Sequence, residues 1–268
     1  TSDGKIYPRQ IIGKVYQVKR NDKIFNPEDL YLIQSSLYFT EIIKIKKALE
    51  KEKIDFVFLK GLPLHLYYEG SYPRRIYADC DVLIPKKNIE VLDKIFSKFY
   101  YQKADTSLTN TLRGLKNKVT EVSYYKKLNN FPVIFDVHFE ISILINQFGK
   151  LEQLYPENFI TKLSSEFIKD KRLITVQNEN FPILSSENLI LYLALHFFHH
   201  NFRGEYRLEF LAKIIKKNAS VNWQNIALVI NDYHLQNFVY PVFSLLRKYY
   251  PVNIPAGFLK SIQPSKRV

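Results

Sequence analysis

The chain has 268 residues, of which 46% are hydrophobic and 24% charged, a composition typical of a folded protein and unlike that of a disordered one. Its 39 lysine and arginine residues outnumber 26 acidic residues, and the net charge of +13 favours phosphate-bearing partners. A single cysteine excludes an internal disulfide, no apolar run approaches the length of a membrane span, and residues 1–10 lack a signal-peptide core, so we expect a soluble, cytoplasmic protein without a membrane partner.

The first predicted element is a long amphipathic helix over residues 26–51. Asn26 is a good N-cap, and Pro27 suits the first helical position. Apolar residues at helical spacing follow: Leu30, Ile33, Leu37, Ile42, Ile45 and Leu49. We expect this stripe to pack against a neighbouring layer of the fold.

A strand, a glycine turn and a short helix are predicted next. Residues 56–59 are wholly apolar, as in a buried strand. The strand ends at Lys60 and Gly61, and residues 62–68 follow as a helix. A helix that begins directly after a glycine turn presents free backbone N–H groups, which makes Lys60 and Gly61 candidate phosphate-binding residues.

The most informative segment is the alternation Asp79-Cys80-Asp81, followed by an apolar run at residues 82–84. On a strand, side chains alternate between the two faces, so both carboxylates point the same way and Cys80 points into the fold. Neighbouring carboxylates repel each other unless water or a cation separates them. The segment is therefore a candidate site for a hard divalent cation, with two solvated acids as the alternative.

Three further elements complete the first half of the chain: a helix at residues 88–100 and strands at 119–127 and 131–139, the strands joined as a hairpin. On the second strand of the hairpin, Asp136, His138 and Glu140 share one face. Two strands that aim acids at one point are what a two-metal phosphoryl-transfer site requires.

After Ile141 the strand signals mostly vanish, apart from residues 173–176, and helical patterns dominate. The expected helices lie at residues 150–169, 186–202, 205–217, 223–233 and 235–249. The predicted fold class is α+β, with a small mixed sheet and packed helices followed by an all-α domain. The expected boundaries are 1–52 for an N-terminal helical segment, 53–141 for the core and 142–268 for the helical domain.

Several of these motifs together resemble the polymerase-β-type nucleotidyltransferase superfamily, and within it a bacterial family of uncharacterised nucleotidyltransferase-like proteins. That family pairs a Leu-Lys-Gly turn with an arginine before an Asp-x-Asp strand and with a later Asp-x-His strand. The matching segments are Phe58-Leu59-Lys60-Gly61, Arg74-Arg75, Asp79-Cys80-Asp81 and Asp136-Val137-His138. The resemblance extends over residues 54–215.

The resemblance implies a metal-dependent enzyme that moves an NMP from an NTP, with ATP as the default donor, to a hydroxyl of a small-molecule or protein acceptor and releases pyrophosphate. Three acids would be catalytic and would hold Mg²⁺ or Mn²⁺: Asp79, Asp81 and Asp136. A second group would bind the nucleotide: Lys60, Gly61, Arg74 and Arg75.

Further candidates support an acid or face the acceptor. His138 shares the strand face of Asp136 and is expected to orient it or to contact the acceptor. His196 begins a histidine-rich helix end, and Arg203 and Arg207 follow it. We favour an acceptor-side patch over a metal site there, because no glutamate directly follows His196, as the zinc-protease motif would require.

Two other functions remain open at this point. Leu62 follows Gly61 where the superfamily usually has serine or glycine, which favours a nucleotide-sensing module with little catalysis. The positive charge and abundant aromatic residues favour a basic RNA- or DNA-binding protein, although nucleic acid is not the preferred partner. The sequence does not predict the acceptor, the base preference or the oligomeric state.

Overall fold

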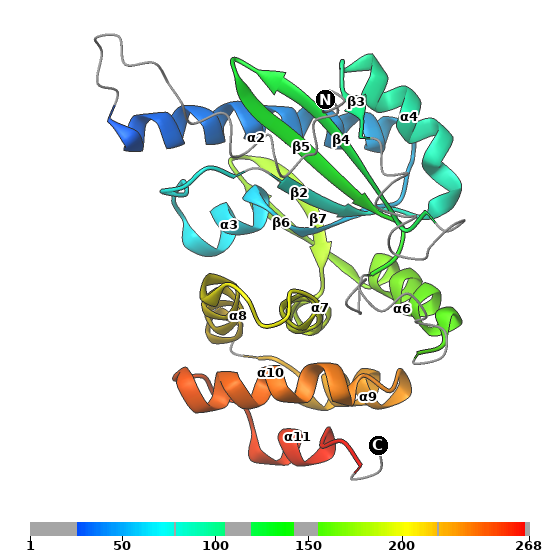
Figure 1. The fold of residues 1–268 in the computed structure, drawn as a ribbon, viewed down its shortest axis with the longest axis vertical. Coiled ribbons are helices and arrows are strands. Elements are labelled where there is room, and N and C mark those ends of the chain that lie inside the picture. Colours follow the sequence, from blue (N-terminus) through cyan, green and yellow to red (C-terminus); the bar gives the residue numbers. More distant parts are fainter. Residues whose placement is uncertain (1–25, 78, 105–118, 142–154, 219, 266–268) are drawn as a thin grey trace, which may run out of the picture. The chain divides into compact units, whose positions relative to one another are not determined.

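The computed structural model describes residues 26–77, 79–104, 119–141, 155–218 and 220–265. These residues form a seven-stranded mixed sheet with packed helices, followed by a helical C-terminal region (Figure 1). The predicted α+β class is therefore confirmed.

The described residues divide into two compact units. The first contains those up to residue 139 together with residues 173–182, and the second contains the others. A segment from beyond residue 142 thus packs with the sheet, while the domain boundaries expected from the sequence stay a prediction.

The sheet has the strand order β3-β4-β5-β2-β1-β7-β6. Its strands are β1 (Val57–Lys60), β2 (Asp79–Leu83), β3 (Gln102–Lys103), β4 (Glu121–Leu128), β5 (Phe131–His138), β6 (Lys171–Val176) and β7 (Glu179–Leu184). Strand β2 pairs in parallel with β5 and antiparallel with β1. The centre of the sheet is therefore made of the strands that carry the acidic motifs.

The β4–β5 hairpin turns at Asn129 and Asn130, as the sequence predicts. Both residues have positive φ angles, 49° and 67°, as a two-residue type I′ turn requires. This turn sets the register of the whole hairpin, from Leu128 opposite Phe131 to Glu121 opposite His138.

The sequence analysis recognised β6 in part but missed β7. The two strands form a hairpin with positive φ angles at Gln177 (49°) and Asn178 (64°). Pro182 lies within β7 and lowers its strand signal, since proline cannot donate to a strand ladder. Phe181 of β7 is fully buried and packs its ring against Phe58 of β1, which explains why the hairpin joins the sheet.

The helices of the first unit are α2 (Pro27–Lys51), α3 (Leu62–Glu69) and α4 (Ile89–Lys98), with the short 3-10 turn η1 (Lys86–Asn88) before α4. The side chain of Asn26 caps α2 by accepting a hydrogen bond from the N–H of Glu28 at 3.2 Å. In the first half of α2, the buried face differs from the apolar stripe that the sequence predicts. Ile33 is 45% exposed, whereas Tyr38 and Phe39 are buried, because the face that meets the sheet runs through positions one residue away.

Two polar side chains on the buried face of α2 fix the strands beneath it. The Gln34 side chain donates to the carbonyl of Tyr77 at 2.6 Å and accepts from the Tyr77 N–H at 3.3 Å. The Tyr38 hydroxyl donates to the carbonyl of Ile134 at 2.7 Å. The helix thereby holds both β5 and the segment that leads into β2.

The helices of the second unit are α6 (Glu157–Lys169), α7 (Ser186–His199), α8 (Glu205–Lys217), α9 (Trp223–Asp232), α10 (Gln236–Tyr249) and α11 (Ala256–Ser261). Their positions agree closely with the helices expected there, except that residues 150–154 lie outside the described chain and α11 was not predicted. Helix α7 is buried almost all round and packs against α8, α9 and α10 as the centre of this unit. Within the part of the chain that the structure describes, every helix falls short of the length or apolar character needed to cross a membrane.

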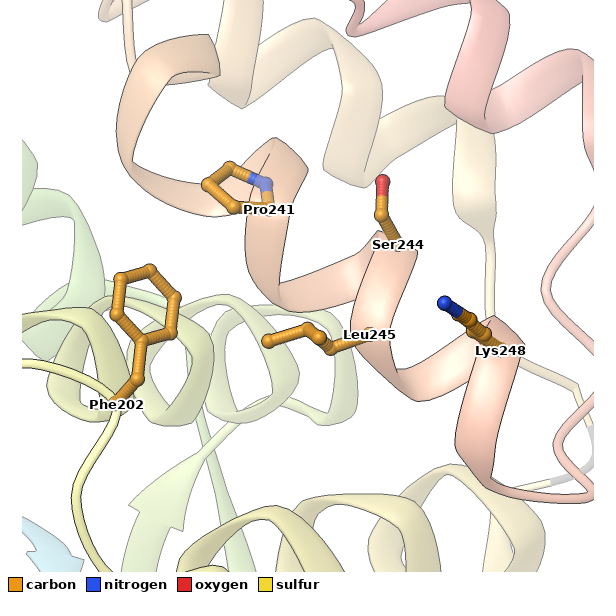
Figure 2. Close-up of a pocket in the computed structure, with 5 residues that line it drawn as sticks. All are labelled: Phe202, Pro241, Ser244, Leu245 and Lys248. Carbon is orange, nitrogen blue, oxygen red and sulfur yellow. The ribbon is translucent and has the colours of Figure 1, made fainter.

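A shallow hollow of about 370 Å³ lies on the helical unit (Figure 2). Its lining is mostly apolar, with one lysine: Phe202, Pro241, Ser244, Leu245 and Lys248. Pro241 lies inside α10, where its ring replaces a backbone N–H.

The double hydrogen bond of Gln34 gives a first prediction. Replacing Gln34 with alanine leaves a buried N–H and a buried carbonyl of Tyr77 without partners, so Gln34→Ala should destabilise the protein by about 2 kcal/mol. Urea unfolding followed by circular dichroism would measure the loss as a lower midpoint. Thr40→Ala is the matched control, because the exposed Thr40 hydroxyl only bonds the backbone of its own helix. Equal midpoints for the two variants would contradict the prediction.

Candidate active site

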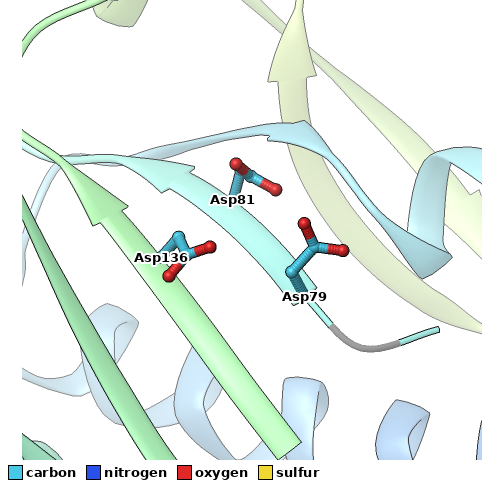
Figure 3. A group of neighbouring side chains, drawn as sticks. All are labelled: Asp79, Asp81 and Asp136. Atoms are coloured by element: carbon cyan, nitrogen blue, oxygen red, sulfur yellow. The ribbon is translucent and has the colours of Figure 1, made fainter. Parts of the chain in front are cut away.

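Three acidic side chains come together where β2 and β5 run side by side. In this parallel pair, Asp81 lies opposite Asp136, and Asp79 precedes Asp81 by two residues. Each acid offers a carboxylate oxygen within 4.8 Å of the others, and Figure 3 shows the three side chains gathered over the two strands. Asp81 is buried, whereas Asp79 and Asp136 are partly exposed, so solvent reaches the group.

Strand alternation explains why the acids point away from the apolar core. Cys80 and Phe135 pair across β2 and β5 and face the opposite way. On that side the ring of Phe135 contacts Tyr38 of α2 and Phe96 of α4. The helices therefore cover the apolar face, and the acids occupy the other face.

Lys60 reaches the acid group from β1. Its ammonium nitrogen lies 3.1 Å from Oδ2 of Asp79 and 2.8 Å from Oδ2 of Asp81. The register of β1 on β2 shifts between Phe58 and Lys60, as at a β-bulge, so that Lys60 stands opposite Asp81. The sequence analysis expected Lys60 to face phosphate, and the structure places it between two carboxylates.

His138 lies between two acids on neighbouring strands. Its Nε2 is 2.9 Å from Oδ1 of Asp81, and its Nδ1 is 3.4 Å from Oε2 of Glu121. The acid that His138 holds is thus Asp81 and not Asp136, the partner expected from the shared strand face. Glu140 lies beyond the end of β5 and accepts a hydrogen bond from Thr161 instead of joining the group.

Two site residues on β4 were missed by the sequence analysis. Ser123 lies opposite Asp136 and donates a hydrogen bond to its Oδ1 at 2.5 Å, and Glu121 lies opposite His138. The sequence does contain a signal that could have identified them, namely the turn of the β4–β5 hairpin. A two-residue turn at Asn129 and Asn130 fixes the pairing of the hairpin and places both residues beside the acid-bearing strand.

The charges of the group shift its acid–base equilibria in opposite directions. Burial opposes ionisation of Asp81, but Lys60 and His138 outweigh it and lower the pKa of Asp81 to about 2. Burial and the neighbouring charges of Asp81 and Glu121 raise the pKa of Asp136 to about 7. Burial would lower the pKa of His138, but Glu121 and Asp81 raise it to about 9.

The donor set of this group fits a hard divalent cation. Magnesium and manganese prefer carboxylate oxygens, and the three acids offer oxygens close enough to share an ion. Burial, together with the neighbouring charges of Asp81 and Glu121, raises the pKa of Asp136, and a bound cation would relieve this repulsion.

Gly61 makes the turn between β1 and α3. Its φ of +112° is strained for other residues, and an added Cβ would lie 3.4 Å from the carbonyl oxygen of Asp79 and the Cα of Cys80. The glycine therefore lets the start of α3 approach the start of β2, which puts the helix N-terminus near the acid strand.

The arginines expected to bind nucleotide lie just ahead of β2 and are exposed. The side chain of Arg74 is 87% exposed, with its Nε 3.9 Å from Oε1 of Glu28. The guanidinium of Arg75 lies 4.5 Å from the ring centroid of Tyr77. Their role in binding a triphosphate stays a prediction.

The acceptor-side candidates belong to the second unit. Nε2 of His196 lies 3.1 Å from Nε2 of His200, one helical turn along α7. Arg207 donates from Nη1 to the carbonyl of Arg203 at 3.1 Å. These residues form one cluster within the unit, and their contact with an acceptor also stays a prediction.

A mixed sheet brings three acids together on two parallel strands, beside a glycine turn that opens a helix, as expected from the resemblance to nucleotidyltransferases. The chain belongs to the family of uncharacterised nucleotidyltransferases, which matches residues 29–251. This match confirms the recognition made from the Lys-Gly, Asp-x-Asp and Asp-x-His motifs.

Two solved structures are similar to the chain. One is the solution structure of the antibiotic-resistance factor ANT(2'')-Ia, with 9% identity, a TM-score of 0.45, and coverage of 81% of this chain and 100% of that one. The other is an antigenic nucleotidyltransferase-like protein from Paracoccidioides brasiliensis, with 14% identity, a TM-score of 0.41, and coverage of 88% and 94%. Among curated proteins, none matches the sequence.

The raised pKa of Asp136 gives a second prediction. The pKa is about 7 in the folded protein, above its ordinary value, so the folded state binds the extra proton and stability falls as pH rises through this window. Asp136→Asn cannot lose that proton. Between pH 4 and pH 7 in EDTA, the variant should gain more than about 1 kcal/mol of stability relative to the wild type.

Urea midpoints measured across this pH range test the prediction. Glu90→Gln serves as the control, because Glu90 is an exposed acid on α4. Its stability should run parallel to that of the wild type. If the curve of Asp136→Asn also ran parallel to the wild type, the carboxyl of Asp136 would not be the crowded group described here.

Proposed function

We propose that this nucleotidyltransferase moves an NMP from an NTP, with ATP as the expected donor, to a hydroxyl of a small-molecule or protein acceptor and releases pyrophosphate. Family membership supports nucleotidyl transfer in general. The observation that carries the proposal is the meeting of Asp79, Asp81 and Asp136 within 4.8 Å on adjacent strands. A cytoplasmic location, expected from the single cysteine, belongs to the same proposal.

The three acids would hold Mg²⁺ or Mn²⁺. Such ions, when bound, would offset the charge of the triphosphate and make the acceptor hydroxyl more acidic. Among the acids, Asp81 is the most firmly held, since Lys60 and His138 both contact it. Its carboxylate is therefore fixed in place before any ligand arrives, which lowers the cost of assembling the site.

Asp136 is suited to receive the proton of the attacking hydroxyl. It is partly exposed, and Ser123 orients it by donating a hydrogen bond to its Oδ1. In this scheme the hydroxyl oxygen forms a bond to the α-phosphorus, its proton passes to Asp136, and the bond from the α-phosphorus to pyrophosphate breaks.

The remaining candidates have roles around this centre. Lys60, Gly61 and the exposed arginines Arg74 and Arg75 would meet the triphosphate, where guanidinium and ammonium groups bind phosphate oxygens. The cluster of His196, Arg203 and Arg207 would contribute to the acceptor side.

One observation favours a second candidate, a nucleotide-binding module with little turnover. Leu62 begins α3 directly after Gly61 and is fully buried, so this position offers no hydroxyl to a phosphate. Binding of an NTP without metal-dependent release of pyrophosphate would support this candidate.

The acids give a third prediction. Asp81→Asn and Asp136→Asn should each lower the rate of nucleotidyl transfer by at least about 100-fold, because each removes a carboxylate charge from the centre. Pyrophosphate release would be measured with each of the four NTPs, with Mg²⁺ or Mn²⁺, and with a panel of hydroxyl-bearing acceptors. Glu90→Gln, a change to an exposed acid on α4, should retain full activity.

Two outcomes would argue against the transferase. Turnover that survives both substitutions would remove the acids from the mechanism. Clear NTP binding by calorimetry with no pyrophosphate release under any condition would favour the sensing module.

A further inference from the structure

Lys60 occupies the place between two of the proposed metal ligands. Its ammonium contacts Oδ2 of Asp79 at 3.1 Å and Oδ2 of Asp81 at 2.8 Å. The Lys60 side chain is 22% exposed and that of Asp81 only 5%, so water screens this pair weakly. The ammonium offsets charge that the carboxylates would otherwise leave uncompensated.

The position of Lys60 depends on a local irregularity of the sheet. Phe58 pairs with Val82, whose side chain belongs to the apolar face of β2. Simple alternation would turn Lys60 toward that same face, since it lies two residues after Phe58. The register shift between them instead brings Lys60 opposite Asp81, and bulges next to active sites commonly redirect a side chain in this way.

An ammonium and a divalent cation compete for the same oxygens. The ammonium contacts Oδ2 of Asp79 and Oδ2 of Asp81, and a divalent ion held by the three acids would draw on the same two carboxylates. Because both are positive, they repel each other if they approach these carboxylates together. The lysine has an alternative, because its flexible stem ends in a point charge that also suits phosphate. A triphosphate bound at the Gly61 turn would give the displaced ammonium a new partner.

We propose that Lys60 is an exchangeable internal cation, which competes with divalent ions for Asp79 and Asp81 and transfers to the triphosphate when nucleotide and metal bind together. This inference rests on the proposed function. The protein therefore binds Mn²⁺ weakly without nucleotide and more tightly with it, so the metal site is completed only when the donor is present.

The fourth prediction is that loss of Lys60 strengthens metal binding, whereas loss of a residue from a binding site usually weakens it. Lys60→Met, which removes the charge and keeps the length of the side chain, should bind Mn²⁺ about tenfold more tightly than the wild type in the absence of nucleotide. A non-hydrolysable ATP analogue should strengthen Mn²⁺ binding in the wild type and much less in Lys60→Met. Free Mn²⁺ would be measured by electron paramagnetic resonance during titration of the whole chain.

The controls separate charge, folding and function. Lys103→Met removes the same charge from an exposed pair with Asp93 and should bind Mn²⁺ as the wild type does. Lys60→Gln keeps a hydrogen-bond donor for the carboxylates, so it tests the same idea if Lys60→Met is poorly folded. A double variant, Asp79→Ala with Asp81→Ala, should lose Mn²⁺ binding both with and without Lys60.

The possible failures are distinct. Equal Mn²⁺ affinity in the wild type, Lys60→Met and Lys60→Gln, with binding lost in the double acid variant, would overturn the competition by Lys60 and leave the metal site intact. Mn²⁺ binding that survives in the double acid variant, or is missing from every variant, would overturn the inference together with the metal centre of the proposed function.

Discussion

The mutual repulsion of three carboxylates is the constraint around which the first unit is organised. Asp79, Asp81 and Asp136 lie within 4.8 Å of one another because β2 and β5 run parallel in a fixed register. Such a group is unfavourable unless positive charge compensates it. The structure places the Lys60 ammonium on one side of Asp81 and the His138 ring on the other. Asp136 has a hydroxyl partner in Ser123, and burial together with the charges of Asp81 and Glu121 raises its pKa. In the proposed function, this asymmetry would give chemically identical side chains different roles, with Asp81 as the fixed anion and Asp136 as the proton acceptor.

Holding this group in place requires rigid support from outside the site. Helix α2 provides it from the opposite face of the sheet through polar contacts that are specific in direction. Gln34 fixes the backbone of Tyr77 just ahead of the acid strand, and Tyr38 fixes the backbone of β5 at Ile134. Since these contacts engage β5 and the segment that leads into β2, a change in the position of α2 would alter the spacing of the carboxylates. The helix that the sequence marks as an N-terminal segment is therefore part of the apparatus that positions the site.

Local sequence rules predicted much of this arrangement. The caps, the alternation of Asp79 and Asp81, the turn at Asn129 and Asn130, and most helices of the second unit follow from short-range patterns, and the structure has them. What escaped prediction depends on pairing between distant segments. Strand β7 carries a proline and becomes a strand only through contact with β1. Glu121 and Ser123 look like ordinary polar residues until the hairpin register places them beside His138 and Asp136. The Lys60 bulge leaves no signature in a four-residue strand, so alternation alone would have aimed this lysine at the core.

The two cations of the group differ in how freely they can leave it. His138 is buried on a central strand and its ring is held by carboxylates at both nitrogens, so the ring is a fixed part of the site. Lys60 is the last residue of β1, directly before the turn at Gly61. Its charge lies at the end of a flexible side chain that is partly exposed. The fixed ring of His138 orients the Asp81 carboxylate. In the proposed exchange, the Lys60 ammonium would compensate Asp79 and Asp81 until a divalent cation replaces it. With His138 as the fixed group and Lys60 as the exchangeable one, the site would tolerate its crowded carboxylates without substrate. It would still accept metal and triphosphate together.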